Sequence, residues 1–334
     1  MQEFRLEVGG ICTTERCNLC CTMCHFNGPS TPKKTRTLAP RLVVKFLREI
    51  PPKQVVEFAG TGEFFMDTNA LAHLRKAGEL GHRPCVLTNG QLLSPELIDA
   101  VLEAGVRRIR MSVDEIDPDR YSCIRKGGDL QNVLDACAYL RSRKAAYPDL
   151  RVEINCILFA ESFPRQSEFV RFWRGRVDQV NFTGEYYEIF KFRNLFFQPS
   201  QRVDCRLAVY LLPSGQMSPC CAISVAQHYC RLDWLPDINV TSPAEGYQMF
   251  QDMYGNSESQ LRQICKKCQW WILFANENGK SPYWRPVPLD LHVTARLRES
   301  LVAVMKHLWV PASFQGQQMR QARNPLVLME RDHQ

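Results

Sequence analysis

Short apolar runs alternate with segments of helical periodicity along the first half of the chain. Six runs are rich in Val, Ile, Leu and Phe, as strands are: residues 6–13, 55–58, 84–87, 108–113, 152–159 and 177–182. Between them, apolar residues recur at helical spacing in residues 41–50, 69–80, 95–104, 130–143 and 168–174. This alternation predicts parallel βαβ units whose crossovers curl the sheet. We therefore expect an α/β fold for residues 1–183, an open partial (β/α)6 barrel.

The pattern changes after this segment. Residues 186–197 are aromatic and basic, and residues 207–212 read as an apolar strand that ends in a Pro-Ser-Gly turn. This pattern predicts a hairpin over about residues 207–220, with Cys205 before it and Cys220 at its end. We assign residues 184–280 to a small cysteine-rich domain. Residues 281–334 are expected to form a tail that contains one helix, because residues 293–308 have helical apolar spacing.

Composition limits the compartment and the partners. The chain has 334 residues and is 45% hydrophobic, but its apolar runs are too short for a membrane span. Its charged N-terminus lacks the apolar core of a signal peptide. Fifteen cysteines in such a chain indicate metal ligation in the reducing cytoplasm rather than disulfides. The net charge of +7 is scattered among acidic residues, so nucleic-acid binding is not expected.

Three cysteines with the spacing C-x3-C-x2-C follow the first predicted strand: Cys17, Cys21 and Cys24. Soft thiolates in one short loop suit an iron–sulfur cubane. Three ligands for four irons leave one iron open to chelate a molecule that carries an amine and a carboxylate. The alternative is a zinc knuckle, for which His25 or Cys20 would be the fourth ligand.

Further chemical groups follow the next predicted strands. A Gly60-Thr61-Gly62-Glu63 turn ends the second strand, and Thr88-Asn89-Gly90 ends the third. The fourth ends in Ser112-Val113-Asp114, and Arg125 comes shortly afterwards. In parallel α/β folds the chemistry lies at these carboxyl ends of the strands.

These motifs, in this order over residues 5–183, resemble the radical S-adenosylmethionine (SAM) superfamily, whose core is a partial TIM-like barrel. The resemblance implies a [4Fe–4S] cluster on the three cysteines and SAM on its open iron. Electron transfer to SAM then yields a 5′-deoxyadenosyl radical that abstracts a hydrogen atom from the substrate. Phe64 departs from the pattern, which has a proline there.

The same resemblance implies roles for individual residues. The glycine–glutamate turn would contact the SAM amine, and Arg125 and Ser112 would contact SAM through the segment that they flank. Asn155, like Asn181, would bond the SAM ribose or the substrate if it faces the barrel interior. The residues expected to bind SAM are Gly60, Gly62, Glu63, Asn89, Ser112, Asp114, Arg125 and Asn155.

A second group of cysteines lies in residues 184–280: Cys205, Cys220, Cys265 and Cys268. Their spacing resembles the SPASM/twitch domains of radical SAM enzymes, and the single C-x2-C pair favours the shorter twitch form. The resemblance implies an auxiliary [4Fe–4S] cluster on these four thiolates. By spacing, Cys221 or Cys230 is an alternative for one ligand, and a four-cysteine zinc ribbon satisfies the same spacing.

The resemblance implies a cytoplasmic oxidoreductase or epimerase that receives electrons from a flavodoxin- or ferredoxin-type protein. The expected substrate is a polar small molecule, such as a sugar or aminocyclitol intermediate of natural-product biosynthesis, because only sixteen residues precede Cys17 and leave no room for a leader-peptide domain. A short peptide is the alternative substrate. A zinc-binding interaction protein and a scaffold without turnover are the alternatives outside radical chemistry.

Auxiliary catalytic groups are harder to assign from the sequence. Cys123 and Cys156 are candidate hydrogen donors, although buried cysteines commonly serve as small apolar residues. Glu185 and Tyr186 are candidate bases for a dehydrogenation.

Overall fold

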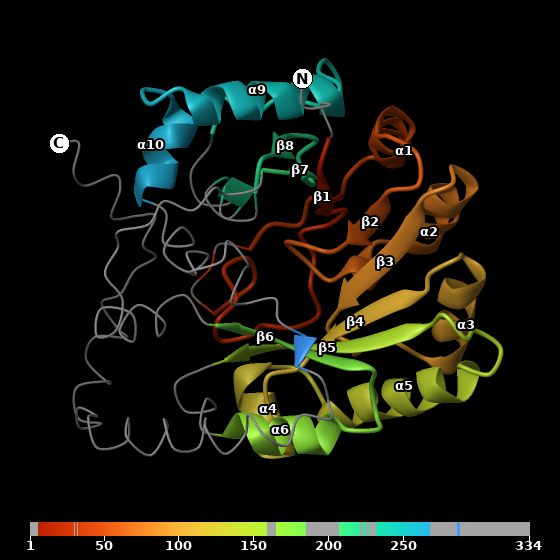
Figure 1. Cartoon of the computed structure of the whole chain (residues 1–334). Helices are drawn as coiled ribbons and strands as arrows, with labels where there is room; N and C mark the ends of the chain where they lie inside the picture. Colours follow the sequence, from red (N-terminus) through yellow and green to blue (C-terminus); the bar gives the residue numbers. More distant parts are fainter. Residues whose placement is uncertain are drawn as a thin grey trace, which may run out of the picture.

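A curved sheet of mostly parallel strands forms the centre of the molecule (Figure 1). The computed structural model describes residues 6–29, 31, 33–158, 165–184, 207–220, 223–224, 227, 232–267 and 286–287. The described strands are β1 (Val8–Ile11), β2 (Val55–Phe58), β3 (Arg83–Thr88), β4 (Arg108–Ser112), β5 (Arg151–Leu158), β6 (Gln179–Gly184), β7 (Val209–Leu211), β8 (Met217–Ser218) and β9 (Pro286–Val287). Their order in the sheet is β8-β7-β1-β2-β3-β4-β5-β6-β9.

Strands β1 to β6 are all parallel and adjacent in chain order. The expected α/β partial barrel is therefore confirmed, and each of the six predicted strands is present. The described helices are α1 (Pro40–Glu49), α2 (Ala70–Glu79), α3 (Pro95–Glu103), α4 (Pro118–Ile124), α5 (Leu130–Arg143), α6 (Gln166–Trp173), α9 (Pro243–Gly255) and α10 (Gln260–Lys267). Helices α4, α9 and α10 and the 3-10 turn η1 (Phe64–Met66) were not predicted from the sequence.

The sheet continues past residue 183, where the sequence placed the end of the barrel. Strand β7 pairs in parallel with β1, and β8 pairs antiparallel with β7. Strand β9, from the expected tail, pairs antiparallel with β6. The hairpin predicted near residues 207–220 thus exists, but its first strand extends the barrel sheet. The helix expected at residues 293–308 lies outside the described residues.

Local signals start several helices. Ser94 caps α3 by accepting the N–H of Leu97, and Pro95 follows it at the first turn. Helix α9 begins with a capping box between Ser242 and Glu245. Helix α9 also contacts α1 and β7, so it packs beside the β1 end of the sheet.

The two faces of the sheet differ in polarity because side chains alternate along each strand. One face is apolar and packs on the helices that surround the sheet in Figure 1; its residues include Val56, Val86, Ile109, Met111, Val152, Ile154 and Val180. The opposite face, which lines the barrel interior, is polar. It carries an interior charge cluster made of Glu57, Arg108, Arg110, Glu153 and Asn181.

Arg110 joins the two carboxylates of this cluster. Its Nη1 donates to Glu57 Oε2 at 2.9 Å, and its Nε donates to Glu153 Oε2 at 3.2 Å. Glu153 also accepts from Arg108 and Asn181. The buried carboxylate is therefore matched by charge and hydrogen bonds, as burial requires.

No helix in the described part of the chain has the length and hydropathy of a membrane span.

Candidate cofactor site

The loop from Cys17 to Cys24 follows β1 at the carboxyl edge of the sheet. Backbone N–H groups point at two of its sulfurs. Leu19 N lies 3.4 Å from Cys17 Sγ, and Asn27 N lies 3.2 Å from Cys24 Sγ. Because hydrogen bonds to the charged form of a thiol favour it, this backbone is suited to hold thiolates.

The same loop is bound through its backbone to the turn after α4. Cys20 N donates to Lys126 O at 2.9 Å, and Thr22 N donates to Ile124 O at 2.9 Å. Gly127 follows with φ 90°, a left-handed conformation that glycine adopts without strain. The turn at residues 124–128 therefore acts as a backbone template for the cysteine loop.

Arg125 lies inside this turn and is almost fully buried, with 6% of its surface exposed. Its Nη2 lies 2.8 Å from Asp114 Oδ2, and its Nη1 approaches Cys21 Sγ at 4.0 Å. Its Nε has no hydrogen-bond partner within the described residues. A buried guanidinium thus faces the cysteine loop with donor capacity to spare.

Burial and charge oppose each other at this position. Burial raises the pKa of Cys21 to about 12, and the nearby Arg125 guanidinium opposes the shift. Burial also raises the pKa of Cys17, and the hydrogen bond from the N–H of Leu19 opposes this shift. Burial raises the pKa of Asp114 above its ordinary value, although Arg125 and the N–H of Ile157 favour its charged form.

Glu63 joins two of the predicted motifs. Its Oε1 accepts from Thr88 Oγ1 at 2.6 Å, and its Oε2 accepts from Asn89 N at 2.7 Å. Burial raises the pKa of Glu63, which these hydrogen bonds oppose. Asn89 in turn donates to Asn18 Oδ1 at 2.8 Å and lies 4.0 Å from Cys17 Sγ. The second and third strand ends therefore meet the cysteine loop.

Gly60 and Gly62 bring the second strand end close to the first. Gly60 has φ 134°, and a Cβ there would overlap the side chain of Cys12. A Cβ on Gly62 would overlap the backbone oxygens of Arg16 and Thr14. The two glycines thus permit close packing between chain segments, and their contact with the SAM amine stays a prediction.

Ser112 and Asn155 are neighbours in register on the polar face of the sheet. Asn155 Oδ1 is buried and has no hydrogen-bond partner within the described residues. Asn181, next in register, donates to Glu153 and so belongs to the interior charge cluster. Of the two asparagines, Asn155 is the one that offers an available acceptor to the barrel interior.

The two candidate hydrogen donors lie elsewhere. Cys123 is exposed on α4. Cys156 follows Asn155 along β5 and therefore points to the opposite, helix-facing side of the sheet. It lines a pocket with Asp114 and Phe182, and burial raises its pKa well above the ordinary value. Its placement favours the alternative interpretation, a buried structural thiol.

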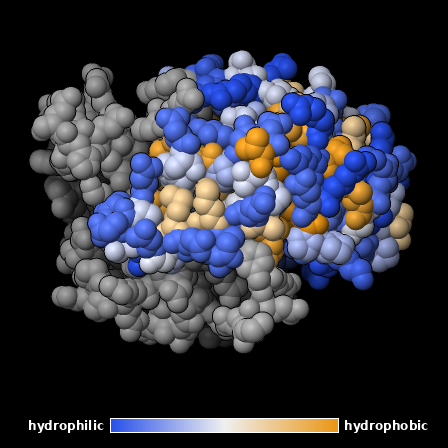
Figure 2. Space-filling model, turned by 90° about the horizontal axis from the view of Figure 1, so that it is seen from above, coloured by the Kyte–Doolittle hydropathy of each residue, from blue (hydrophilic) through white to orange (hydrophobic). Residues whose placement is uncertain are grey.

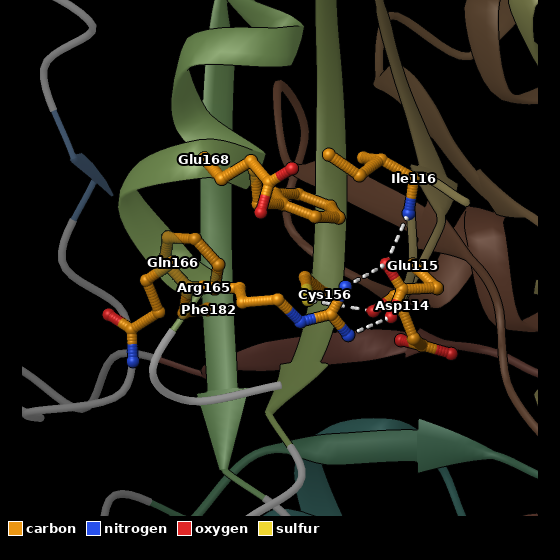
Figure 3. Close-up of a pocket in the computed structure, with 9 residues that line it drawn as sticks. Asp114, Glu115, Ile116, Cys156, Arg165, Gln166, Glu168 and Phe182 are labelled. Carbon is orange, nitrogen blue, oxygen red and sulfur yellow. Dashed lines mark hydrogen bonds and ion pairs between the residues drawn. The ribbon is translucent and has the colours of Figure 1, made fainter. Parts of the chain in front are cut away.

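Figure 3 shows this pocket, where the loop after β4 meets the start of α6. Arg165 pairs with Glu115 across it, with Nη1 at 3.2 Å from Oε1. Glu115 also accepts the backbone N–H of Ile116. Arg165 and Glu115 thus neutralise each other in this pocket, which Cys156 lines from the helix-facing side of the sheet.

The predicted auxiliary site is only partly within the described residues. Cys220 accepts the N–H of Ile223 at 3.5 Å, and Cys265 is buried in α10. Cys205 and Cys268, the alternative ligands Cys221 and Cys230, and the candidate bases Glu185 and Tyr186 lie outside those residues. Across the described part of the chain, no three Cys, His, Asp or Glu side chains converge as ligands of one metal ion. The auxiliary cluster therefore stays a prediction.

Sequence reasoning missed several residues of this site. Asn18 lies within the cysteine loop, and Asn27 follows it and donates to Thr61 O at 2.9 Å. Gln91 directly follows the Thr88-Asn89-Gly90 motif and bonds Tyr121. Their adjacency to the motifs is the sequence signal that was available for Asn18 and Gln91.

Residues 11–159 match the family model of the radical SAM superfamily. The chain contains a radical SAM domain. The matched segment covers the cysteine loop, the turns that hold it, and strands β1 to β5. The donor set fits the cluster of that family by type and setting, because backbone N–H groups point at the sulfurs of Cys17 and Cys24 and a buried guanidinium lies 4.0 Å from that of Cys21. In the described part of the chain the three sulfurs do not converge as ligands of one metal ion.

Curated relatives match parts of this domain. A GTP 3′,8-cyclase of Alkaliphilus oremlandii is 46% identical over 50 residues, which are 15% of this chain and 15% of that protein. A GTP 3′,8-cyclase of Listeria monocytogenes is 27% identical over 178 residues, which are 52% of each chain. The chain thus spans about half or less of the length of these relatives.

The fold also matches a solved structure over most of the chain. SuiB of Streptococcus suis, bound to the precursor peptide SuiA, aligns with a TM-score of 0.57 and 14% identity. The alignment covers 86% of this chain and 76% of SuiB. At this identity the likeness shows a shared fold.

Proposed function

We propose that the chain is a radical SAM enzyme that acts on a polar small molecule. The observation that carries the proposal is the buried Arg125 guanidinium beside Cys21 in a loop of three thiols. When bound, a [4Fe–4S] cluster with an open iron supplies the electron that cleaves SAM to a 5′-deoxyadenosyl radical.

The chain's own residues have separate tasks in this proposal. Cys17, Cys21 and Cys24 hold the cluster and leave one iron open. Arg125 binds the SAM carboxylate through the donors that Asp114 leaves unused, since a guanidinium suits a carboxylate. The glycine–glutamate turn at residues 60–63 takes the SAM amine.

Ser112 and Asn155 bind the ribose or the substrate from the polar face of the sheet. The amide oxygen of Asn155, which has no hydrogen-bond partner within the described residues, favours a bound molecule that carries hydroxyl or amine donors. A sugar or aminocyclitol has such groups, and hydrogen abstraction from it leads to oxidation, epimerisation or rearrangement. The paired charges of the interior cluster favour a substrate that needs no counter-ion there.

The curated relatives support a second candidate substrate. Because the matched segments belong to GTP 3′,8-cyclases, a purine nucleotide is the alternative small molecule. A ribosomal peptide is the further alternative. An auxiliary [4Fe–4S] cluster on Cys205, Cys220, Cys265 and Cys268 would exchange electrons with the barrel, and a flavodoxin- or ferredoxin-type protein would be the electron donor.

The test starts with anaerobic reconstitution, iron analysis and reduction in the presence of SAM. We expect release of 5′-deoxyadenosine from the native protein and from Cys20→Ala, and none from Cys21→Ala. A fully loaded native protein that leaves SAM intact, or an active Cys21→Ala variant, contradicts the proposal.

Substrate choice is tested with the same protein. Deuterated aminocyclitols, sugars and GTP are offered separately, and deuterium in 5′-deoxyadenosine is measured by mass spectrometry. Transfer from a sugar or aminocyclitol supports the first candidate, and transfer from GTP alone supports the second.

A further inference from the structure

The side chain of Gln91 uses its entire hydrogen-bonding capacity at the edge of the site. Its Nε2 donates to Tyr121 Oη at 3.1 Å and to Asp129 O at 2.9 Å. Its Oε1 accepts from Asp129 N at 2.8 Å and from Asn132 Nδ2 at 3.1 Å. A primary amide has two donor hydrogens and two acceptor lone pairs, so all four are occupied.

These bonds join two turns that are far apart in sequence. The first is the turn after β3, where Gln91 N also donates to Asn89 Oδ1 at 2.9 Å. The second is the turn between α4 and α5, which ends at Asp129. Without Gln91, the turn after β3 would lose four hydrogen bonds, two to the turn at Asp129, one to Tyr121 in α4 and one to Asn132 in α5.

The cysteine loop lies between the same two turns. On one side, Asn89 bonds Asn18 and approaches Cys17 Sγ at 4.0 Å. On the other side, the backbone of residues 124–126 accepts the N–H groups of Cys20 and Thr22. The separation of the turns therefore determines where Cys17 and the Cys20–Thr22 segment lie relative to each other.

We propose that Gln91 is a positioning residue for the cysteine loop, acting by tying the turn that contacts Cys17 to the turn that contacts Cys21. It touches neither thiol. A cubane has fixed dimensions, so three thiols bind it well only when their spacing is set in advance. The consequence for turnover rests on the proposed function, whereas the consequence for the loop itself does not.

The side chain is half-buried and outside the hydrophobic core, so its replacement removes no core side chain, although it takes a partner from the hydroxyl of the buried Tyr121. This makes Gln91→Leu a usable variant. Gln91→Glu keeps both acceptor bonds and loses both N–H donors, so the bond to Asp129 O disappears and the bond to Tyr121 remains only with the tyrosine hydroxyl as donor. Gln131→Leu is the matched control, because the side chain of Gln131 donates to Asp135 on the exposed side of α5 and its backbone bond to Asp129 is unaffected by the substitution.

The test measures amide hydrogen exchange in the full, metal-free chain. In Gln91→Leu we expect exchange at Cys20 and Thr22 to accelerate about tenfold, with Gln91→Glu between Gln91→Leu and the native chain. Exchange in β4 serves as the internal reference and stays unchanged. In reconstituted protein, iron release to a chelator should also accelerate about tenfold in Gln91→Leu and remain native in Gln131→Leu.

Unchanged exchange at Cys20 and Thr22 in Gln91→Leu overturns the proposal. So does acceleration that is equal in β4, since that reports global destabilisation. Because the exchange is read in metal-free protein, it decides on Gln91 even if the native protein fails to cleave SAM.

Discussion

The buried pair of Asp114 and Arg125 leads to a prediction about stability with and without the cluster. Asp114 is 1% exposed and its Oδ2 lies 2.8 Å from Arg125 Nη2. Asp114→Asn keeps the size of the side chain and the acceptor for the N–H of Ile157. It removes the negative charge and leaves the guanidinium buried without its counter-ion.

Removing one partner of a buried ion pair costs about 3–5 kcal/mol. Since the asparagine still accepts hydrogen bonds, we expect Asp114→Asn to lower the free energy of unfolding of the metal-free protein by about 3 kcal/mol. When the cluster is loaded, its thiolates provide negative charge close to Arg125, whose Nη1 is 4.0 Å from Cys21 Sγ. We therefore expect the loaded protein to lose roughly half as much.

The assay is urea unfolding of metal-free and reconstituted protein under anaerobic conditions. The control is Asp99→Asn, because Asp99 pairs with Arg143 at the same distance of 2.8 Å but both side chains are about one-third exposed. Asp99→Asn should lower the free energy of unfolding by less than about 1 kcal/mol in both the metal-free and the reconstituted protein. Equal losses from the two variants, or a larger Asp114→Asn loss in the loaded protein, would refute the reasoning.

Three further predictions test the barrel itself. The buried thiol of Cys85 has its pKa raised to about 12 from 9.0, so the unfolded chain ionises first and the free energy of unfolding falls as pH rises from about 9 towards 12. Cys85→Ala should reduce this slope by up to about 1.4 kcal/mol per pH unit, measured by urea unfolding at pH 8 to 10.5, and an unchanged slope contradicts the assignment. Arg110→Met should lower the free energy of unfolding by about 2–4 kcal/mol, because Arg110 is buried between two carboxylates. Arg108→Met should lower it by only about 1 kcal/mol, because the Arg108 side chain is 42% exposed. Equal urea midpoints for the two variants would argue against the interior charge cluster. Gly60→Ala should lower the free energy of unfolding by about 2–5 kcal/mol, because the added methyl group overlaps Cys12 at a φ of 134°. Gly105→Ala, at a φ of 91° in open space, should lower it by about 1–2 kcal/mol. Similar losses in thermal melts would mean that Gly60 does not contact Cys12.

The elements of the barrel follow from local signals in the sequence. The run at residues 55–58 is predicted with the bounds of β2; β3 is one residue longer than its prediction at each end, and β4 is one residue shorter at its C-terminal end. Helix α4 was missed because its seven residues are too few for a periodic pattern. Its start signal, Asp117 followed by Pro118, was nevertheless present, and Asp117 caps the N–H of Arg120.

Contacts between distant segments do not follow from such signals. The run at residues 207–212 was predicted as a strand, but no local pattern tells a strand which neighbour it pairs with, and β7 pairs with β1. The same holds for Gln91, whose partner Asp129 is 38 residues away. The motifs around the cysteine loop were found by resemblance, while the bonds that hold them together needed the structure.

The phase of β5 decides between two of the predicted site residues. Asn155 and Cys156 are adjacent, so they project from opposite faces of the sheet. The register pairs Asn155 with Ser112 on one side and Asn181 on the other, which places it on the polar face. Cys156 is 1% exposed among the apolar residues that face the helices. A radical formed in the barrel interior is thus separated from the Cys156 thiol by the sheet itself, and under the proposed function its hydrogen donor has to be another group.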